Sequence, residues 1–403
     1  MSIAFYGRRE KFDLSLRYFS TANKAVCCGC TACEQICPAD AIHMEKDMEG
    51  FLYPVLDRQK CVECDQCSEV CPMENSAEQD EMIEAFAAVH VDEDVLRTSS
   101  SGGVFTAIAE GILDAGGCVF GAVLENNKVV HHMAETKDEL AAMRGSKYVQ
   151  SELGNTLRQV QECLCAGKMV LFSGTPCQCA ATRRLAGDAQ EKLLTVDVVC
   201  HGVPSPAVFA DYIQWLSEVH RSPIQFLGFR AKQKNRMGVI ETYQTRNGVK
   251  MHPAYDSRYL TGFLRGYFFR PSCYECPYAT ILRSSDMTIC DFWGCERYHP
   301  QLDTLKGISG VIVNTPKGQD WLARASGALR LTPTTVEKIA AGNANLQHPT
   351  PKPQERDKFY EDRLQINFAE LSKRYLLDNA AWRKRIVAKV PKRIKMMLKG
   401  IGR

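Results

Sequence analysis

Two cysteine runs near the start of the chain have a spacing that suits iron–sulfur chemistry. They are Cys27-x2-Cys30-x2-Cys33-x3-Cys37-Pro38 and Cys61-x2-Cys64-x2-Cys67-x3-Cys71-Pro72. Paired C-x2-C motifs also make structural zinc sites, which need four thiolates in two pairs. Here each run has a third cysteine two residues further on and a fourth before proline, so the spacing favours iron–sulfur clusters over zinc. The runs predict a protein that moves electrons.

This repeated pattern is that of bacterial two-cluster ferredoxins. In those proteins three thiolates of one run hold three corners of a cubane, and the fourth cysteine of the run ligates the other cluster. We therefore predict two 4Fe-4S clusters in a small α+β ferredoxin domain at residues 21–75. The first would be held by Cys27, Cys30, Cys33 and Cys71, and the second by Cys61, Cys64, Cys67 and Cys37.

The rest of the chain is too long to be part of a ferredoxin. At 403 residues, with 45% hydrophobic and 24% charged residues, it predicts two to three globular domains. Residues 1–11 lack the apolar stretch of a signal peptide, and no apolar run is long enough for a transmembrane helix. Cysteines in a protein kept inside the cell are usually metal ligands or free thiols. We expect the reducing cytoplasm of an anaerobe, because thiolate-bound clusters tolerate oxygen poorly.

The last 21 residues differ in charge from the rest. Residues 383–403 hold nine basic side chains and no acidic one, whereas the net charge of the whole chain is +3. Apolar residues at near-helical spacing, interrupted by Pro391, make this tail amphipathic. It could contact an anionic membrane surface at the inner face of the membrane or an acidic partner, or it could be solvated. One short basic tail does not indicate nucleic-acid binding.

Strand and helix patterns alternate after a polar segment at residues 76–84. We predict helices at 102–115 and 151–166, a hairpin of strands at 118–124 and 129–134, and strands at 169–173, 193–200 and 310–315. Thr136 and Glu139 have capping-box spacing for a further short helix. This alternation predicts an α/β core. Prolines at 349–353 precede a helical C-terminus, so the expected domains are 21–75, 84–345 and 346–403.

A second set of cysteines lies in loops that follow predicted strands, where α/β proteins usually bind ligands. Cys177 and Cys200 each follow a strand, and Cys273-x2-Cys276 adds a pair. These four can form a tetrathiolate site, although Cys179, Cys290 and Cys295 are close enough in sequence to leave the choice open. Cysteines such as these last two, and Cys28, Cys118, Cys163 and Cys165, are most often buried or inert thiols.

Six motifs in this region occur in the order found in one known family. They are Ser99-Ser-Ser-Gly-Gly-Val104, Arg144-Gly-Ser-Lys-Tyr148, Gly174-Thr-Pro-Cys-Gln178, Cys200-His-Gly-Val-Pro204, Cys273-x2-Cys276 and Ser285-Asp-x4-Asp291-Phe-Trp-Gly294. Over about residues 84–330 the chain resembles the coenzyme F420 hydrogenase/dehydrogenase beta-subunit family. The resemblance implies an α/β domain that binds FAD and a third 4Fe-4S cluster. It assigns that cluster to Cys177, Cys200, Cys273 and Cys276.

The resemblance also suggests where a flavin would bind. No G-x-G-x-x-G follows a strand, so a Rossmann site is not indicated. Ser101, Gly102 and Gly103 precede a helix N-terminus that could face an anion, although a plain helix cap has the same pattern. The other implied contacts are Ser146, Lys147, Tyr148, Thr175, Pro176, Asp286 and Asp291. Lys147 would stabilise the reduced ring, and His201 would supply protons or tune the adjacent cluster.

These expectations describe an iron–sulfur flavoprotein oxidoreductase. Cubane clusters pass single electrons and a flavin can exchange two, so the chain would link a carrier such as ferredoxin or a reduced deazaflavin to a small organic substrate. Two alternatives are a non-catalytic electron-transfer subunit of a larger reductase or hydrogenase, and a ferredoxin fused to a scaffold without flavin. Neither the substrate nor the use of F420 follows from the sequence.

Overall fold

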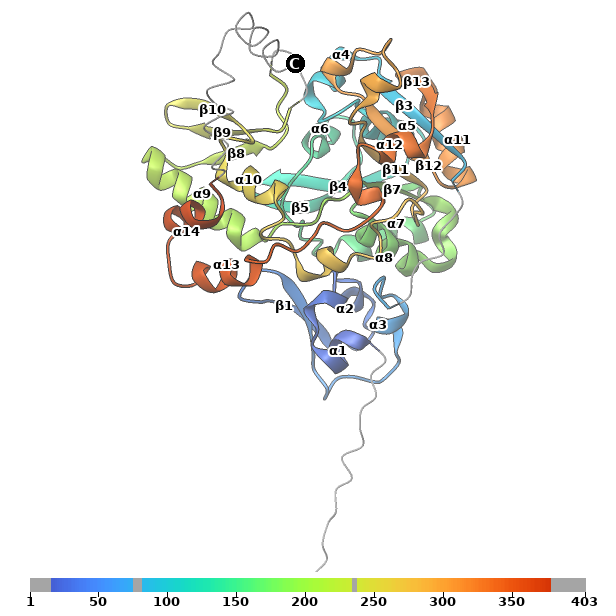
Figure 1. Ribbon diagram of the computed structural model, residues 1–403. Coiled ribbons are helices and arrows are strands. Elements are labelled where there is room, and N and C mark those ends of the chain that lie inside the picture. The colour runs from blue at the N-terminus through green and yellow to red at the C-terminus, as the bar shows by residue number, and fades with distance from the viewer. Residues whose placement is uncertain (1–15, 75–81, 234–237, 378–403) are drawn as a thin grey trace, which may run out of the picture.

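The computed structural model describes residues 16–74, 82–233 and 238–377, and the predicted basic tail lies outside these ranges. A small N-terminal domain with few elements sits beneath a large mixed α/β body (Figure 1). Among the described residues, no helix is long and apolar enough to cross a membrane.

The N-terminal domain consists of short helices around one β-hairpin. Strands β1 and β2 pair antiparallel, with Ile42 opposite Leu56 and Lys46 opposite Leu52. Their turn is closed by Asp47, whose carboxylate accepts hydrogen bonds from the backbone N–H groups of Glu49 and Phe51. The structure therefore places a hairpin between the two cysteine runs. The elements are α1 (Arg17–Thr21), α2 (Ala32–Ile36), β1 (Ile42–Lys46), β2 (Leu52–Leu56) and α3 (Gln66–Glu69).

The body is built on an eight-stranded sheet in the order β13-β3-β12-β11-β7-β6-β4-β5. Four neighbouring strands, β4, β6, β7 and β11, run parallel, while the pairs at both sides are antiparallel. The bounds are β3 (Glu84–His90), β4 (Cys118–Glu125), β5 (Lys128–Ala134), β6 (Val170–Gly174), β7 (Leu193–Val198), β11 (Met287–Asp291), β12 (Ser309–Val313) and β13 (Leu329–Thr334).

Helices cover both faces of this sheet, because its central strands are apolar on both sides. Val119, Leu171 and Leu194 face the cluster that contains α5, whereas Phe120 and Phe172 face the cluster that contains α7 and α8. The helices around the sheet are α4 (Glu93–Thr98), α5 (Val104–Asp114), α6 (Leu140–Met143), α7 (Thr156–Cys165), α8 (Pro176–Ala186), α11 (Pro316–Arg324) and α12 (Val336–Ala340). The predicted α/β architecture is confirmed.

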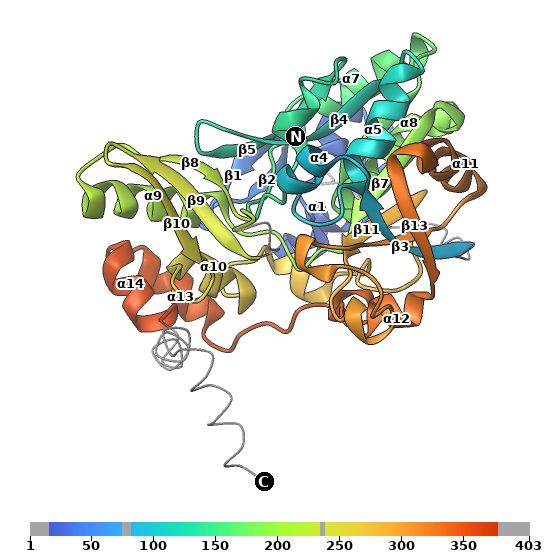
Figure 2. The ribbon, with the colours of Figure 1, turned by 90° about the horizontal axis from the view of Figure 1, so that it is seen from above.

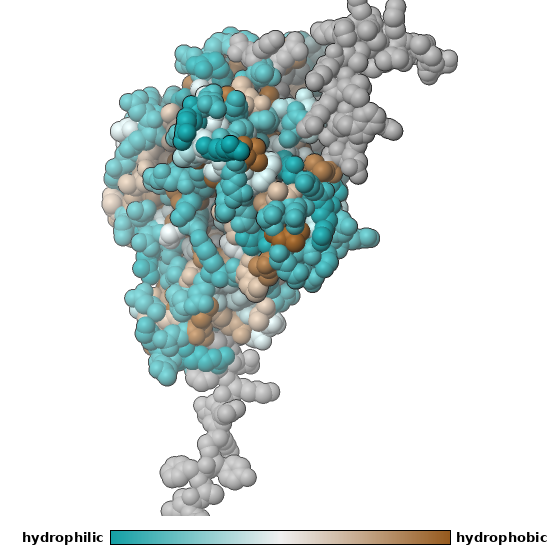
Figure 3. Space-filling model, turned by 90° about the vertical axis from the view of Figure 1, so that its left-hand side faces the viewer, coloured by the Kyte–Doolittle hydropathy of each residue, from teal (hydrophilic) through white to brown (hydrophobic). Residues whose placement is uncertain are grey.

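A second, three-stranded sheet was not predicted. Strands β8 (Gln225–Gly228), β9 (Ile240–Thr245) and β10 (Gly248–Pro253) lie to one side of the main sheet (Figure 2). An aromatic core joins this sheet to neighbouring helices. These helices are α9 (Pro206–His220), α10 (Arg258–Leu264), α13 (Arg356–Arg363) and α14 (Phe368–Tyr375). This side of the molecule is mostly hydrophilic, with hydrophobic residues in separate spots (Figure 3).

Several predicted boundaries need correction. The helix expected at 151–166 begins only at Thr156, because residue 152 instead forms a β-bridge to Val130. Glu139 accepts hydrogen bonds from the backbone of Glu135 and Thr136, but the helix that follows starts at Leu140, after the expected capping box. Glu84, expected in a linker, is the first residue of β3.

Candidate metal centres and flavin site

The carboxyl ends of three parallel strands meet at one edge of the main sheet. After β6, Cys177 lies in the first turn of α8; the loop after β7 carries Cys200, and β11 ends at Asp291. The strands are in register, with Ser173 beside Val196 and Val198 beside Ile289. Ligand sites of open α/β sheets usually occur at this edge.

One predicted ferredoxin site surrounds a cavity of about 300 Å³. Cys37, Cys61, Cys64 and Cys67 all line it, and these four are the cysteines expected to hold the second cluster. Cys64 is exposed, and the neighbouring Val62 side chain is 64% exposed. We call this place the outer site, because it lies at the surface.

The other ferredoxin site, here the inner site, is formed by Cys27, Cys30, Cys33 and Cys71. The thiol pKa of Cys33 is raised well above its usual range, first by burial and then by the charges of Cys27 and Cys71. The charge of Cys71 also acts on Cys30. The first run and the last cysteine of the second run are therefore neighbours in space, as the crossed pattern requires.

The third site, here the body site, draws its cysteines from three parts of the chain. Cys177, Cys200, Cys273 and Cys276 line one cavity of about 40 Å³. Cys177 lies in the first turn of α8, where Thr175 and Gln178 form a capping box. The Cys273 thiol accepts a hydrogen bond from the backbone N–H of Val203 at 3.4 Å.

Burial raises the pKa of Cys200 to about 12 and that of Cys276 to about 11, and the nearby Cys177 charge adds to both shifts. These thiols are therefore protonated at neutral pH while no metal is bound. Iron binds thiolates, so loading this site releases protons. These cysteines suit a cluster whose iron supplies the positive charge that compensates their thiolates.

The alternative ligands lie elsewhere. Cys179 is fully buried among apolar residues of α8, and Cys295 is fully buried in another core cluster. Cys290 points at Gly310, where an added Cβ would lie 2.9 Å from its sulfur. Cys28, expected to be a buried or inert thiol, is buried, and it also lines the body cavity and contacts the thiols of both Cys177 and Cys30. The inner and body sites are therefore adjacent.

The predicted flavin loop at Ser99–Gly103 is packed onto the sheet edge. Ser101 Oγ donates to the carbonyl of Ile308 at 2.8 Å, and the N–H of Gly102 donates to Ser309 Oγ at 2.9 Å. A Cβ on Gly102 would lie 2.2 Å from the carbonyl oxygen of Ala88, and Gly103 has a φ of +84°. These contacts explain both glycines by packing and turn geometry.

The second flavin motif lies against this loop. The N–H of Ser146 donates to Ser100 Oγ at 2.7 Å. The Lys147 ammonium donates to the carbonyls of Met143 and Arg144 at the end of α6, and burial lowers its pKa to about 7. Tyr148 stacks on Phe263 with ring centroids 4.1 Å apart.

Arg230, which was not among the predicted site residues, joins these parts. Its guanidinium forms a two-point ion pair with Asp291 at 2.7 and 3.1 Å. It also donates to Tyr148 Oη at 3.0 Å and to the carbonyl of Ser100 at 3.2 Å. Two predicted flavin residues, Tyr148 and Asp291, and Ser100 of the predicted loop thus meet around one buried cation. A strand-end arginine has no distinctive spacing, so only the folded chain reveals it.

A second cation missed by the sequence analysis is Lys232. Its ammonium donates to the carbonyl of Ser101 at 2.8 Å. Burial lowers its pKa to about 8, and the charge of Arg230 contributes to that shift. Lys147 and Lys232 flank the same loop, and both have lowered pKa values. An anionic group bound there would restore their charges, so the residues fit the phosphates or the reduced ring of FAD.

Asp286 is not brought to this place. It precedes β11, at the opposite end of the strand from Asp291, and is 1% exposed. Its carboxylate accepts hydrogen bonds from Thr195 and Thr315 at 2.8 Å, so its oxygens already hold strands together.

His201, Thr175 and Pro176 lie beside the body site and line its cavity. The His201 ring contacts Asn345 Oδ1 at 3.0 Å and the carbonyl of Leu264 at 3.3 Å. The ring also lies edge-on to Phe263, with centroids 5.2 Å apart. Because Phe263 stacks on Tyr148, aromatic rings connect the body site to the predicted flavin region.

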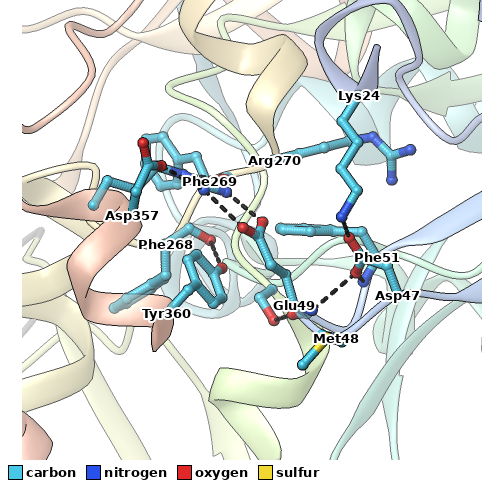
Figure 4. A network of polar contacts seen from close by, with 12 residues as sticks. Lys24, Asp47, Met48, Glu49, Phe51, Phe268, Phe269, Arg270, Asp357 and Tyr360 are labelled. Atoms are coloured by element: carbon cyan, nitrogen blue, oxygen red, sulfur yellow. Dashed lines mark hydrogen bonds and ion pairs between the residues drawn. The ribbon is translucent and has the colours of Figure 1, made fainter. Parts of the chain in front are cut away.

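The hairpin turn of the N-terminal domain is held by residues far along the chain (Figure 4). Arg356 of α13 pairs with both oxygens of Glu49, at 2.9 and 2.5 Å, and donates to the carbonyl of Phe269 at 2.7 Å. Gly50 has a φ of +88°, and a Cβ there would lie 2.3 Å from that of Ala207. The turn is therefore fixed to the body.

Comparisons with known proteins agree in extent with this division. Residues 26–75 match the family described as 4Fe-4S dicluster domain. Residues 85–158 and 167–338 match the N-terminal and C-terminal families of coenzyme F420 hydrogenase/dehydrogenase, beta subunit. No curated protein sequence matches the chain. A chain of the F420-reducing NiFe hydrogenase complex from Methanosarcina barkeri is similar at 17% identity and a TM-score of 0.46, over 72% of this chain and 95% of that one.

Proposed function

The chain belongs to the coenzyme F420 hydrogenase/dehydrogenase beta-subunit family, with a 4Fe-4S ferredoxin-type domain in front, and on this premise we propose a specific function. Family membership makes it an iron–sulfur oxidoreductase. The proposal is that three 4Fe-4S clusters connect an external electron carrier to FAD, where a small organic substrate or a deazaflavin is reduced or oxidised. The proposed domains are 21–75, 84–345 and 346–403.

The observation that carries the proposal is the body cavity. Cys177, Cys200, Cys273 and Cys276 come from three separate segments and line this one cavity. Cys28 of the ferredoxin-type domain lines it too, and its thiol contacts Cys177. A cluster in the body would therefore stand next to the inner site, which supports a continuous route for electrons from the outer site into the body.

The residues around the Ser99–Gly103 loop support the flavin part. When bound, FAD would exchange single electrons with clusters and electron pairs with a substrate. Lys147, Arg230 and Lys232 would hold its anionic groups, and Arg230 would keep Tyr148 and Asp291 in place. Phe263, between Tyr148 and His201, would exclude water between this region and the body site. We assign His201 a positioning role, because the chain itself engages both ring nitrogens.

A second candidate function is that of an electron-transfer subunit docked on a separate reductase or hydrogenase. The exposure of Cys64 and Val62 at the outer site favours it, because a partner protein could approach that cluster directly. Under either function the carrier would be a ferredoxin or a reduced deazaflavin. We also propose that the protein is cytoplasmic and that its basic tail at 383–403 contacts a membrane surface.

Iron, acid-labile sulfide and flavin content of protein purified without oxygen tests the proposal. About 12 irons and one FAD per chain are expected for three clusters and one flavin. About 8 irons without flavin after reconstitution would contradict it. With cofactors in place, reduced ferredoxin and reduced F420 are offered as donors to the isolated chain. Reduction of its FAD followed by turnover of an organic acceptor supports the enzyme, whereas reduction without turnover supports the subunit function.

A further inference from the structure

Arg270 is a fully buried cation that lies between two predicted cluster sites. Its relative exposure is 0%. Its backbone N–H donates to Val203, and its carbonyl accepts from the N–H of Cys273, so the main chain belongs to the body site. Its side chain reaches the other way, into the ferredoxin-type domain, where Nε donates to the carbonyl of Cys27 at 2.7 Å.

The ferredoxin-type domain is shaped around this guanidinium. Nη2 donates to the carbonyl of Leu52 at 2.8 Å and lies 3.4 Å from Cys27 Sγ. The guanidinium carbon lies 4.1 Å from the ring centroid of Tyr53. Gly29 leaves it room, since a Cβ there would lie 2.5 Å from Nη1. Two carbonyls, a sulfur and an aromatic face thus orient the charge toward the inner site.

Among residues 16–74, 82–233 and 238–377, no carboxylate forms an ion pair with Arg270. Within the described part of the chain, the negatively charged groups acting on it are the thiolates of Cys27, Cys28 and Cys273 and the phenolate form of Tyr53. By contrast, the buried Arg283 near the body site pairs with Asp197 at 3.0 Å. Burying an unpaired charge costs several kcal/mol, so Arg270 requires compensating negative charge. Because arginine stays protonated in proteins, its charge is constant.

We propose that Arg270 is a positioning residue that raises the reduction potential of the inner cluster, the one on Cys27, Cys30, Cys33 and Cys71, relative to the outer one. This inference rests on the proposed function, because it requires the clusters. Reduction adds one electron to the cluster and changes no bond or proton. The fixed positive charge at Cys27 Sγ favours the more negative, reduced state.

The outer site has negatively charged surroundings, in contrast to the positive charge of Arg270 at the inner site. The cavity of the outer site is lined by Glu63 and Asp65, whose carboxylates give it a negative environment. A negative environment disfavours reduction, whereas Arg270 favours it at the inner site. Electrons that enter at the exposed Cys64 would therefore move inward, toward the body site. Arg270 thus gives the electron route its direction.

The test is a redox titration of the full chain, purified without oxygen and followed by the electron paramagnetic resonance of its reduced clusters. Iron and sulfide are measured first. In R270Q we expect unchanged iron and at least a tenfold fall in the equilibrium constant for reducing one cluster, which equals 59 mV for one electron. For each of the other two clusters, we expect the equilibrium constant for reduction to change by less than a factor of two. In the wild type, the affected cluster is reduced before the other ferredoxin-type cluster.

Two further variants separate charge from docking. R270K keeps the charge on a shorter side chain, so we expect a smaller fall in the same direction. R356Q removes the ion pair with Glu49 that attaches the same domain, and it is expected to shift no midpoint. If R270Q loses a cluster, the redox titration of R270K becomes the test. An unchanged midpoint of the inner cluster in R270K would then overturn the inference.

Unchanged potentials in R270Q with full iron content would also overturn it, as would an equal shift in R356Q. Absence of iron from the wild type, after reconstitution, would instead contradict the proposed function, so the two failures are distinguishable.

Discussion

Arg356 and Glu49, which are 307 positions apart, form a two-point ion pair that closes the C-terminal helices over the hairpin of the ferredoxin-type domain. The Arg356 side chain is 3% exposed and that of Glu49 is 17% exposed. The backbone carbonyl of Glu49 also accepts a hydrogen bond from Ser205 Oγ. One residue of the turn is thus held by two distant segments of the body.

Replacing Glu49 is expected to loosen this attachment. Glu49→Gln leaves the buried Arg356 charge unpaired, so the free energy of locally opening the hairpin should fall by about 3 kcal/mol. Hydrogen–deuterium exchange of the β1–β2 amides measures this opening. Asp357→Asn is the matched control, because Asp357 contacts the same arginine at 3.4 Å but is 65% exposed, and its loss should cost less than about 1 kcal/mol. Equal exchange in both variants would argue against a stabilising role of the Glu49–Arg356 ion pair.

Cys177→Ser should remove the body cluster and spare both ferredoxin-type clusters. We expect about four fewer irons per chain, because one thiolate ligand of one cubane is lost. Cys179→Ser is the control, since Cys179 lies in the same helix but is buried among apolar residues. Iron analysis together with sulfide analysis gives the count. Unchanged iron in Cys177→Ser, or equal loss in Cys179→Ser, would refute the ligand assignment.

Lys147 should make FAD binding depend on pH. With a pKa of about 7 in the flavin-free chain, Lys147 loses its proton as the pH rises above that value. An anionic ligand binds the charged form, so the dissociation constant should rise above pH 7, by up to about tenfold per unit. His131 nearby stays neutral, because burial lowers its pKa to about 4. Flavin fluorescence titrations from pH 6 to 9 measure the effect.

Lys147→Arg supplies the control for this profile, because arginine keeps its charge across the whole range. The dissociation constant of Lys147→Arg for FAD should change little with pH. Lys147→Met should bind FAD weakly, with a dissociation constant that also changes little with pH. A wild-type profile that matches either variant would exclude Lys147 as the titrating contact.

Arg230→Lys should weaken FAD binding at least tenfold and leave the iron content unchanged. A lysine cannot reproduce the two-point pair with Asp291 together with the contacts to Tyr148 and Ser100. Flavin retained after gel filtration is the readout. Arg258→Lys is the control, because Arg258 lies over Trp215, outside the flavin region. If Arg230→Lys retains flavin as well as this control does, the flavin site lies elsewhere.

Glu241 predicts a pH-dependent stability. Burial raises its carboxyl pKa to about 7 from the usual 4.5, although Tyr212 and Ser257 donate hydrogen bonds that oppose the shift. The folded state therefore holds a proton that the unfolded state releases, so its stabilising effect is complete below pH 4.5 and is lost as the pH rises to about 7. Glu241→Gln should be more stable than the wild type at pH 8, by roughly 2–3 kcal/mol, and not at pH 5. Urea unfolding followed by tryptophan fluorescence compares them.

The ferredoxin-type cysteines could be predicted because their ligand spacing is local in the sequence. The body site needed the order of strands, since Cys177, Cys200 and Cys273 meet only when β6 and β7 lie side by side. The family resemblance selected four cysteines that line one cavity. The contact of the buried Cys28 with Cys177 could not be predicted, because it depends on how the two domains pack.

The second sheet and several site residues could not be predicted, because their sequence pattern was misleading or absent. The buried face of β9 consists of Glu241, Tyr243 and Thr245, so its alternation hides polar residues rather than apolar ones. A reading based on hydrophobic periodicity therefore missed the second sheet. Arg230 and Arg270 act through distant partners and have no motif spacing. Asp286 and Asp291 are close in sequence, but a strand separates them in space.

The separation of 307 positions between Glu49 and Arg356 also has a consequence for biosynthesis. At translation rates of about 5–20 residues per second, Glu49 is synthesised roughly 15–60 s before Arg356, its ion-pair partner. The segments that carry Gln150 and Arg270, which contact Cys28 and Cys27, are made within that interval, so they cover the inner site only in its later part. The order of synthesis thus gives the inner site a period of open access in which iron and sulfide can be inserted before the body closes over it.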